Sequence, residues 1–525
     1  MSKRKWIFDI VMVILGGALL FLSLPKPEIP LLAWVSLVPL LFAISGKKPS
    51  HAALLGFLFG LTAYIGIFYW TSYPIAMYGG IPVFLAITFM FLLVMYISLY
   101  PTVFAYFVVW SKERFSLSEF VSVPIAWTTL EYLREFILTG FPWGYLGHSQ
   151  LPWLNLMQIL DITGVYGVSF VIASVNACIF LIILRIVKKR QNFPVAETLI
   201  SVLLVATLII YGLYAMRRED KIVKSIAPIT VALIQGNIRQ DLKWDPSYQE
   251  ETVHIYETLS IASIDYSSDI VIWPETATPF FFDLDDTYRP RILELPRKLN
   301  AYLLFGTPAY EMGEDDYIFF NRSYVLSPRG EIIGRYDKIH LVPFGEYIPY
   351  KKILFFVDKF VYSVGDMRSG TITEPIETNV GSIGTLICYE AIFPEISRIF
   401  ARNGASLLVN ITNDAWFGET SAPYQHFSMA RMRAIETRLP LVRAANTGIT
   451  AIIKPTGEAE LVSTIFTRSV IVGDINPNNR TTFYTRFGDI FAQIVTALFF
   501  FLIVVHLYSI IRLKLKRSAV ERKKK

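Results

Sequence analysis

Residues 381–414, GSIGTLICYEAIFPEISRIFARNGASLLVNITND, decide the fold of the second half of the chain. Two apolar runs, 381–390 and 405–414, have the length and the Ile, Leu and Val content of strands. Between them, PEISRIFARNG carries apolar residues at helical spacing. A strand, an amphipathic helix and a second strand in this order are typical of a sheet covered by helices. The stretch therefore predicts an α/β fold.

The same alternation continues on both sides, over residues 217–488. Charges of both signs occur here, and the apolar runs are short. Two more stretches, YQEETVHIYETLSIASI and FSMARMRAIETR, carry apolar residues at helical spacing. The other predicted strands and hairpin arms are PITVALIQGNI, SDIVIWPE, AYLLFGTPAY, FFNRSYVLSPRGEIIGRYDK, PLVRAANTGITAIIKPTGE and STIFTRSVIVGDI. We expect residues 217–488 to form an α/β sandwich.

The composition indicates that lipid is the solvent for much of the remaining chain. Hydrophobic residues make up 53% of the 525 residues and charged residues only 18%, whereas globular proteins carry roughly 25% charged residues. A helix that crosses a bilayer needs about 20 mainly apolar residues. Candidate spans lie near residues 6–24, 30–46, 52–73, 81–110, 116–138, 160–187, 197–216 and 489–512. We therefore expect a polytopic α-helical membrane domain with eight spans, of which 116–138 is the weakest because of Glu131, Arg134 and Glu135.

Lys and Arg near the ends of the spans predict the orientation. If all eight spans are real, one side carries the clusters at residues 3–5, 47–48, 112–114 and 188–190 and the tail after residue 512. The positive-inside rule makes that side the cytoplasm. Arg217 and Arg218 are the one pair on the other side. The net charge of +6 does not predict a nucleic-acid partner, because these cations gather at the ends of apolar segments.

This orientation predicts four parts. Residues 1–216 form a transmembrane domain of seven helices, 217–488 a catalytic domain on the outer side, 489–512 an eighth transmembrane helix, and 513–525 a basic cytoplasmic tail. In a Gram-negative cell the outer side is the periplasm, so we expect a multi-pass protein of the inner (cytoplasmic) membrane.

The chain has two cysteines, Cys178 and Cys388, which excludes a disulfide framework and a Cys-rich metal site. Cys178 lies in the apolar run SFVIASVNACIFLIIL and is expected to pack as a small hydrophobic residue. Cys388 ends a predicted strand, and a free thiol outside the cytoplasm needs burial to escape oxidation. No metal-ligand spacing, phosphate loop or Ser-His-Asp arrangement occurs in the sequence. We expect neither a metal nor a cofactor.

Three predicted strands end in residues that can carry chemistry. VIWP leads to Glu275, GRYD to Lys338 and SIGTLI to Cys388. Sites in open α/β sheets gather where strand ends meet, so we expect these side chains to converge. Each alone has an ordinary interpretation, as a surface carboxylate, a solvated partner of Asp337 or a core cysteine.

Together, the three form a set that can transfer an acyl group. Cys is the best nucleophile among side chains but acts as a thiolate. Glu275 can take the thiol proton and return it to a leaving or attacking group. Lys338 can donate hydrogen bonds to a tetrahedral oxyanion, with a backbone N–H near Cys388 or Tyr389 as a second donor.

The sequences around these residues resemble the three catalytic stretches of the nitrilase superfamily: VIWPETA, RYDKIHLVPFGEYIP and LICYEAIFPE. Two longer stretches, LEYLREFILTGFPWGYLGHSQ and NDAWFGETSAPYQHFSMARMRAIETRLPLVRAANTGIT, resemble the membrane-embedded branch of that superfamily, the apolipoprotein N-acyltransferases. The resemblance covers nearly the whole chain and implies a nitrilase-like αββα sandwich between the seventh and eighth spans. Leu439 departs from the family, which often has Arg before the following proline.

The resemblance also implies an activity. By likeness, Glu275 is the general base, Lys338 stabilises the oxyanion and Cys388 is the nucleophile. The family moves the sn-1 acyl chain of a phospholipid onto the cysteine. It then passes the acyl group to the N-terminal amine of diacylglyceryl-cysteine in apolipoproteins, the last step of lipoprotein maturation. No cofactor is implied.

Four further residues match the family. Glu346 and Glu390 match glutamates treated as essential, and Glu346 is expected near Lys338 or the substrate amine. If the backbone after Cys388 stays extended, Glu390 points to the same side as the cysteine. Tyr389 and Trp244 match residues associated with substrate handling, and ordinary packing is the alternative for both.

Some neighbouring features are predicted to be structural. Residues 351–366, KKILFFVDKFVYSVGD, are interpreted either as a lid that dips into the outer leaflet or as a cover for the domain's own core. His426 is expected to be buried and hydrogen-bonded. Asn413, Asp414 and Trp416 are expected to form a rigid turn near the pocket.

Two competing functions remain open from the sequence. One is a membrane-anchored amidohydrolase that uses the same three residues with water as the acceptor. The other is a non-catalytic membrane scaffold with a degenerate ectodomain, which the intact Glu275, Lys338 and Cys388 disfavour. The membrane spans and the apolar segment favour lipid substrates over those of a simple amidase.

Overall fold

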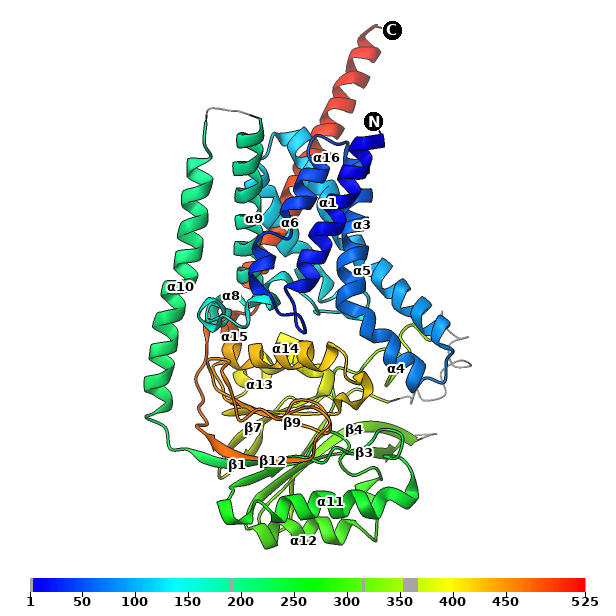
Figure 1. Ribbon diagram of the computed structural model, residues 1–525, viewed down its shortest axis with the longest axis vertical. Helices are drawn as coiled ribbons and strands as arrows, with labels where there is room; N and C mark the ends of the chain where they lie inside the picture. The colour runs from blue at the N-terminus through cyan, green and yellow to red at the C-terminus, as the bar shows by residue number, and fades with distance from the viewer. Residues whose placement is uncertain (1–2, 189–191, 314–316, 353–366, 525) are drawn as a thin grey trace.

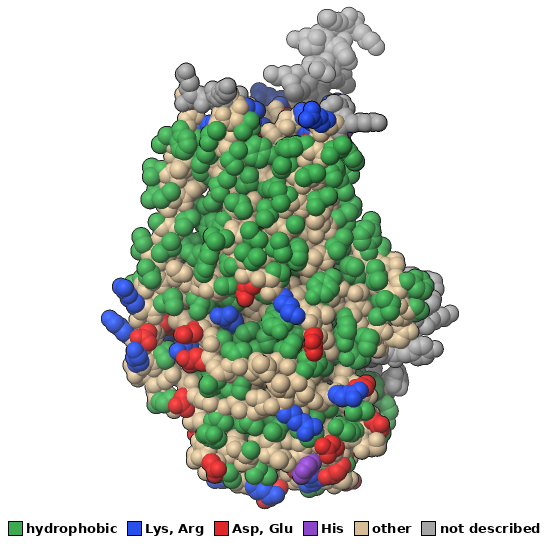
Figure 2. All heavy atoms as spheres, viewed as in Figure 1, with side chains coloured by type: hydrophobic (Ala, Val, Ile, Leu, Met, Phe, Trp, Pro, Cys, Tyr) green, Lys and Arg blue, Asp and Glu red, His purple; other side chains and the backbone are tan. Residues whose placement is uncertain are grey.

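The computed structural model describes residues 3–188, 192–313, 317–352 and 367–524. Figure 1 shows a bundle of long helices at one end of the molecule and two stacked sheets at the other. Figure 2 shows a broad apolar belt over the helices, between cations at the far end and mixed charges over the sheets. The predicted combination of an α-helical membrane domain and an α/β sandwich is therefore confirmed.

Six helical segments in the described part of the chain are long and apolar enough to cross a membrane. They are Arg4–Leu22, Pro49–Met77, Val83–Phe115, Val165–Val187, Val195–Val223 and Ile490–Arg512. They correspond to helices α1 (Lys3–Leu22), α3 (Pro49–Phe68) with α4 (Ser72–Met77), α5 (Val83–Phe115), α9 (Val165–Val187), α10 (Val195–Val223) and α16 (Ile490–Lys524).

The prediction of eight spans is not confirmed. The segment predicted at 30–46 consists of a short 3-10 turn, Pro30–Trp34, and the seven-residue α2 (Val38–Ile44). Helix α6 (Glu119–Arg134) has only 16 residues. It ends at Arg134, whose guanidinium donates to the Tyr64 hydroxyl and to the Trp143 carbonyl at 2.9 Å each. A buried arginine thus binds polar partners where a spanning helix would continue with apolar residues.

The basic segments lie at the end of the bundle that is farthest from the sheets. Figure 1 shows the start of α1, the start of α3 and the ends of α5 and α9 there, together with both chain termini. These elements carry the clusters at residues 3–5, 47–48 and 112–114 and Lys188. These clusters therefore share one end of the bundle, whereas Arg217 and Arg218 belong to the last part of α10, which ends beside the sheets.

The first sheet has six strands in the order β12-β1-β2-β3-β4-β5. β1, β2 and β3 are parallel to one another, while β12, β4 and β5 pair antiparallel with their neighbours. The strands are β1 (Ile229–Gln235), β2 (Ile270–Ile272), β3 (Tyr302–Met312), β4 (Tyr317–Leu326), β5 (Ile332–Asp337) and β12 (Ser469–Ile475).

The second sheet repeats this pattern in the order β11-β10-β9-β8-β7-β6. β7, β8 and β9 are parallel, and the outer strands are antiparallel. The strands are β6 (Ile376–Thr378), β7 (Gly381–Ile387), β8 (Leu407–Thr412), β9 (Leu441–Ala445), β10 (Ala451–Ile453) and β11 (Ala459–Glu460). The strands predicted from residues 381–390 and 405–414 are the parallel neighbours β7 and β8.

Helices cover both outer faces of the two sheets. Figure 1 shows α11 (Gln249–Ile261) and α12 (Arg289–Leu299) beneath the first sheet. It shows α13 (Pro394–Arg402) and α14 (Ala422–Thr437) between the second sheet and the helix bundle. The layers therefore follow the order αββα, and one helix layer also faces the membrane part.

Buried polar contacts fix the sandwich against the bundle. Gln425 of α14 accepts hydrogen bonds from the indoles of Trp70 at 3.2 Å and Trp143 at 2.7 Å. Arg438, just after α14, donates to Asp161 at 2.9 Å and is fully buried. Short linking helices fill the same junction: α7 (Leu154–Met157), α8 (Leu160–Thr163) and α15 (Phe483–Phe487). Because buried partners cost free energy when they separate, the two parts are expected to hold one relative position.

Candidate active site

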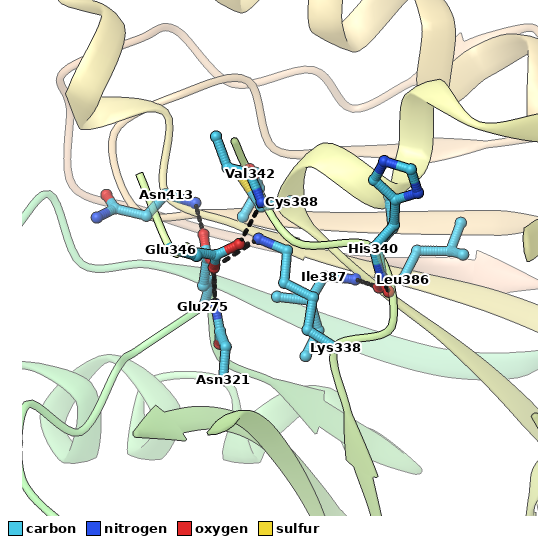
Figure 3. Close-up of polar contacts among 12 residues, drawn as sticks. Glu275, Asn321, Lys338, His340, Val342, Glu346, Leu386, Ile387, Cys388 and Asn413 are labelled. Atoms are coloured by element: carbon cyan, nitrogen blue, oxygen red, sulfur yellow. Dashed lines mark hydrogen bonds and ion pairs between the residues drawn. The ribbon is translucent and has the colours of Figure 1, made fainter. Parts of the chain in front are cut away.

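The topology brings Glu275, Lys338 and Cys388 to one place. Glu275 follows β2 and Lys338 follows β5, two strands that run in the same direction within the first sheet. Cys388 follows β7 of the second sheet. Figure 3 shows the Glu275 and Lys338 side chains pointing toward each other, and Lys338 Nζ lies 3.7 Å from Glu275 Oε1. The structure thus brings together the ends of strands from both sheets.

Both oxygens of the Glu275 carboxylate accept a hydrogen bond. The Asn321 side chain donates to Oε1 at 2.8 Å, and the backbone N–H of Asn413 donates to Oε2 at 2.8 Å. Asn321 lies in β4 and Asn413 directly follows β8, so each sheet contributes one donor. The carboxylate is buried and oriented before any substrate binds.

Lys338 is a buried cation between two carboxylates. Its Nζ lies 2.8 Å from Glu346 Oε1 in addition to the contact with Glu275. Burial alone would lower the pKa of Lys338, but the charges of Glu346 and Glu275 outweigh burial, so its pKa is raised above the ordinary value. Lys338 therefore stays protonated and can donate hydrogen bonds to an oxyanion.

Cys388 occupies an unusual backbone conformation. Its φ is +51°, in the left-handed region that non-glycine residues rarely adopt. It begins a 3-10 helix, Cys388–Ile392, directly after β7. Such a residue costs about 1–3 kcal/mol and persists where the surroundings determine it. The sharp change of direction places the cysteine at the sheet edge.

The thiol is protonated in the resting site. Burial raises the pKa of Cys388 well above its ordinary value, the charge of Glu275 raises it further, and the charge of Lys338 lowers it. Because a thiol is a poor nucleophile, attack requires removal of the proton at the same time. The charges of two carboxylates, Glu275 and Asp414, raise the pKa of this thiol, and Glu275 has the larger effect.

A buried network holds the backbone behind the cysteine. His426 Nε2 lies 3.0 Å from the Cys388 carbonyl oxygen and Nδ1 lies 3.0 Å from Asp414 Oδ1. Arg443 donates to Asp414 Oδ2 at 2.7 Å. His426 therefore has the buried, hydrogen-bonded position expected of it. The turn at Asn413 contacts Glu275 directly, whereas Trp416 packs on Tyr78.

Glu346 lies beside Lys338, one of the two positions expected for it. Its Oε1 accepts from Lys338 and from Asn321 at 2.8 Å each, and its Oε2 accepts from the backbone N–H of Val342 at 2.7 Å. Asn321 thus bridges Glu346 and Glu275 (Figure 3). Glu346 and Glu275 therefore both compensate the charge of Lys338.

The expectation that Glu390 points to the same side as Cys388 is wrong. It assumed an extended backbone, but Cys388–Ile392 is a 3-10 helix. Glu390 is fully buried and accepts four hydrogen bonds: from the Tyr336 hydroxyl and the backbone N–H groups of Ile339, His340 and Ile387, at 2.7 to 3.1 Å. It ties the turn after β7 to the turn after β5. Its contacts fix the segments that carry Cys388 and Lys338.

Replacing Glu390 by Ala is expected to destabilise the protein more than replacing it by Gln. Ala leaves four donors without an acceptor, and the two that are fully buried, the Tyr336 hydroxyl and the Ile387 N–H, cost about 1–3 kcal/mol each. Gln keeps one side-chain oxygen, which can still accept some of these hydrogen bonds. The measurement is the apparent melting temperature in detergent, with Glu395→Ala, an exposed carboxylate on α13, as the control. Equal melting temperatures for Glu390→Ala and the wild type would contradict the bracing role.

The remaining predicted residues have different environments. Tyr389 is buried, and its ring packs on Phe393 and His340. Trp244 is 51% exposed and belongs to the loop after β1. Residues 353–366 of the predicted lid lie outside the described residues. For Tyr389 and Trp244, the choice between substrate handling and packing stays a prediction.

The sequence interpretation missed two buried polar residues. Asn321 sits within the apolar run of β4, and Lys243 precedes Trp244 in the loop after β1. Lys243 is 2% exposed and donates to the backbone oxygen of Glu275 at 3.2 Å. The position of Asn321, a polar residue inside an apolar predicted strand, could have indicated a buried functional side chain. Nothing local distinguishes Lys243 from a solvated lysine.

Comparison with known proteins identifies relatives of both parts of the chain. Residues 230–484 match the carbon-nitrogen hydrolase family, and residues 16–178 match the N-terminal domain of apolipoprotein N-acyltransferase. The chain is similar to the apolipoprotein N-acyltransferase of Geobacter metallireducens, with 47% identity over 92% of each chain.

More distant relatives carry the same name. The proteins of Methylococcus capsulatus and Haemophilus influenzae, both named apolipoprotein N-acyltransferase, are 34% and 32% identical. The first alignment covers 91% of this chain and 92% of the relative, and the second covers 94% of each. The similarity therefore extends over the membrane helices and the sandwich together.

Proposed function

Because this chain belongs to the apolipoprotein N-acyltransferase family, we propose that it acylates lipoproteins through a thioester on Cys388. It is an acyltransferase of the membrane, and its reaction is lipoprotein N-acylation. The proposal concerns the donor, the intermediate and the residues. The donor is the sn-1 chain of a phospholipid, and the acceptor is the amine of diacylglyceryl-cysteine.

One observation carries this proposal: the buried Cys388 lies beside Glu275 and Lys338, whose side chains are 3.7 Å apart (Figure 3). A base that is oriented by two hydrogen bonds and a cation that is held by two carboxylates flank one nucleophile. This combination supports nucleophilic acyl transfer, which needs a proton acceptor and a donor to the oxyanion.

In the first half-reaction, Glu275 takes the thiol proton as the sulfur attacks the ester carbonyl carbon. Lys338 donates to the oxyanion that forms. The C–O bond then breaks, and Glu275 gives its proton to the departing alkoxide oxygen. The products are a thioester on Cys388 and a lysophospholipid.

In the second half-reaction, the uncharged amine of the lipoprotein attacks the thioester carbonyl carbon. Glu275 accepts a proton from the nitrogen as the C–N bond forms, and Lys338 again stabilises the oxyanion. The C–S bond breaks, and Glu275 returns the proton to the sulfur. Two amphiphilic substrates therefore never need to occupy the site together.

The contact between the site and the helix bundle supports a lipid donor. One continuous apolar core contains Phe68 and Trp70 of the bundle, Trp143 of the junction, and Cys388 and Tyr389 of the site. An acyl chain held against this core stays out of water, which favours its binding. A soluble amidase needs no such continuity.

We also propose the cellular arrangement. The basic end of the bundle faces the cytoplasm, following the positive-inside rule, and residues 217–488 lie in the periplasm as the catalytic domain of an inner-membrane protein. Residues 1–216 and 489–512 form its transmembrane part, and 513–525 its cytoplasmic tail. Phospholipids of the outer leaflet are then within reach of the site.

The auxiliary residues have separate proposed tasks. Glu346 compensates the charge of Lys338, and Glu390 holds together the segments that carry Lys338 and Cys388. Tyr389, buried next to the nucleophile, contacts the acyl donor, and the exposed Trp244 contacts the acceptor.

Intact-protein mass spectrometry tests the intermediate. After incubation with a phospholipid of one defined sn-1 chain, we expect the mass of one such acyl group on the protein, removable by neutral hydroxylamine. Peptide mapping is expected to place it on Cys388. Donors labelled at sn-1 or sn-2 distinguish the two positions.

The lifetime of the acyl-enzyme separates transfer from hydrolysis. With a diacylated lipopeptide, the acyl group is expected to move to the peptide amine, and without it the thioester is expected to persist. Decay that is equally fast without the peptide indicates an amidohydrolase that uses water, and contradicts the proposed acceptor.

A further inference from the structure

His426 is a buried histidine that the proposed mechanism does not use. It lies in α14, between the second sheet and the helix bundle, and is 1% exposed (Figure 1). Its Nε2 lies 3.0 Å from the Cys388 carbonyl oxygen. A carbonyl oxygen only accepts hydrogen bonds, so Nε2 carries a hydrogen and donates it, whatever the partner of Nδ1. The imidazole therefore holds the backbone of the nucleophile itself.

The ring of His426 is held from both parts of the molecule. Its Nδ1 lies 3.0 Å from Asp414 Oδ1, and Arg443 donates to the other oxygen of this carboxylate at 2.7 Å. On the side of the helix bundle, the ring centroid of Trp143 lies 5.9 Å from that of His426. Because turning the ring would break buried polar contacts, the Nε2–H group keeps a fixed direction.

The Cys388 carbonyl belongs to the same peptide unit as the Tyr389 N–H. This peptide bond is trans, and in a planar trans peptide the carbonyl and the N–H point in opposite directions. His426 holds the carbonyl on one side, so the Tyr389 N–H points to the other side. The nitrogen is also only a few covalent bonds from the Cys388 sulfur. A group that fixes the carbonyl therefore fixes a donor beside the nucleophile.

The Tyr389 N–H is free to bind a substrate oxygen. Tyr389 is the second residue of the 3-10 helix Cys388–Ile392, and the first N–H groups of a helix have no partner inside it. Among the residues that the structure describes, no other group accepts a hydrogen bond from this N–H. Tyr389 is buried, and buried N–H groups without a partner are rare and cost about 1–3 kcal/mol. An oxyanion on the sulfur-bound carbon would satisfy this donor.

We propose that His426 is a positioning residue for acyl transfer: its Nε2–H fixes and polarises the peptide unit that joins Cys388 and Tyr389. The Tyr389 N–H then donates to the oxyanion together with Lys338. Hydrogen bonds in a chain polarise one another, so a bond accepted by the carbonyl strengthens the N–H of the same peptide as a donor. This inference rests on the proposed acyl transfer. Because an oxyanion forms in both half-reactions, His426 acts in both, and it transfers no proton.

The test compares two substitutions that each keep one of the two contacts of the ring. The amide of Gln in His426→Gln can reach the position of Nε2 and donate to the Cys388 carbonyl. The shorter amide in His426→Asn can keep the contact with Asp414 but cannot reach that carbonyl. The control is His254→Asn, a change of an exposed histidine in α11.

The full-length proteins are acylated on Cys388 with the nitrophenyl ester of a fatty acid that has an isotope-labelled carbonyl carbon. Infrared spectroscopy then measures the stretching frequency of the thioester carbonyl, which falls when the carbonyl accepts hydrogen bonds. The rates of acylation and of transfer to a diacylated lipopeptide are measured on the same proteins, together with their melting temperatures in detergent.

We expect His426→Asn to slow both half-reactions about ten- to hundredfold and to raise the carbonyl frequency. The expected loss is smaller than the roughly 10²- to 10³-fold that follows complete removal of an oxyanion donor, because the N–H is misdirected and less polarised but still present. His426→Gln is expected to keep both rates within a few-fold of the wild type and to keep its carbonyl frequency. His254→Asn is expected to match the wild type in every measurement.

Other outcomes overturn the inference. Equal rates in His426→Gln and His426→Asn, or a wild-type carbonyl frequency in His426→Asn, would show that the bond to the Cys388 carbonyl does not act on the oxyanion. Failure of either variant to fold would assign His426 to stability alone. A wild-type frequency equal to that of a free thioester in an apolar solvent would show that no donor reaches the carbonyl. The proposed function fails separately, if the nitrophenyl ester acylates Cys388 and phospholipid does not.

Discussion

Cys388→Ala is expected to abolish both thioester formation and acyl transfer. The loss is expected to be on the order of 10⁴-fold or more, as when a covalent nucleophile is removed from other enzymes. The change removes the thiol on which the charges of Glu275 and Lys338 act, so the proposed base and cation no longer have their nucleophile. The measurements are intact-protein mass after incubation with phospholipid and the rate of lipopeptide acylation.

The second cysteine provides the matched control. Cys178 is buried in α9 and contacts the Thr198 hydroxyl, far from the strand ends that carry the site. Cys178→Ala is expected to keep the acyl mass, and Cys388→Ser is expected to lose nearly all activity because a hydroxyl loses its proton less readily than a thiol. Normal turnover by Cys388→Ala would end the thioester mechanism.

Glu275→Gln is expected to slow both half-reactions by about 10²- to 10⁴-fold, the usual contribution of a general base. Gln keeps the size of the side chain and one acceptor oxygen, so the bond from Asn321 or that from Asn413 can persist and the fold is expected to survive. It cannot take a proton from the thiol, whose pKa is raised by burial and by the charge of Glu275 itself.

The rates of acylation and of transfer are to be measured separately, because the same residue is proposed to act in both. Glu331→Gln, an exposed carboxylate next to β5, is the control for a change of charge. A loss confined to the acylation step would mean that another group accepts the proton from the amine. Rates within a few-fold of the wild type in both steps would remove Glu275 from the mechanism.

Most strands of the sandwich could be predicted from local sequence patterns. Each predicted strand or hairpin corresponds to strands of the two sheets, because a buried strand needs an apolar run whatever its neighbours are. Helix α12 was not predicted. It contains Pro290 and Pro296, which usually indicate a break, but Pro290 lies in the first turn, where the missing N–H is tolerated.

The membrane part was predicted less accurately at two positions. Hydropathy averages over a window and does not see that residues 30–44 are split into a turn and a short helix. It also cannot show that Arg134 donates to the Tyr64 hydroxyl and the Trp143 carbonyl. Such pairing depends on Tyr64 of α3, which lies 70 positions away, and on the turn that brings Trp143 back to Arg134.

The sequence by itself determined the class of each region and singled out three residues that the structure brings together. The lengths of strands and spans are local properties of the sequence. Lys338 and Cys388 directly follow β5 and β7, and Glu275 lies three residues after the end of β2. Strand ends at one sheet edge meet, which accounts for Glu275 and Lys338, whereas the approach of Cys388 from the second sheet depends on how the two sheets stack.

Only the tertiary structure decided the direction of Glu390, the donors to Glu275 and the burial of Lys243. The left-handed backbone at Cys388 turns Glu390 away from the thiol and toward four donors. Lys243 reaches Glu275 across 32 positions of sequence. These contacts depend on which strands are neighbours and how two sheets stack, and no local pattern of residues carries that information.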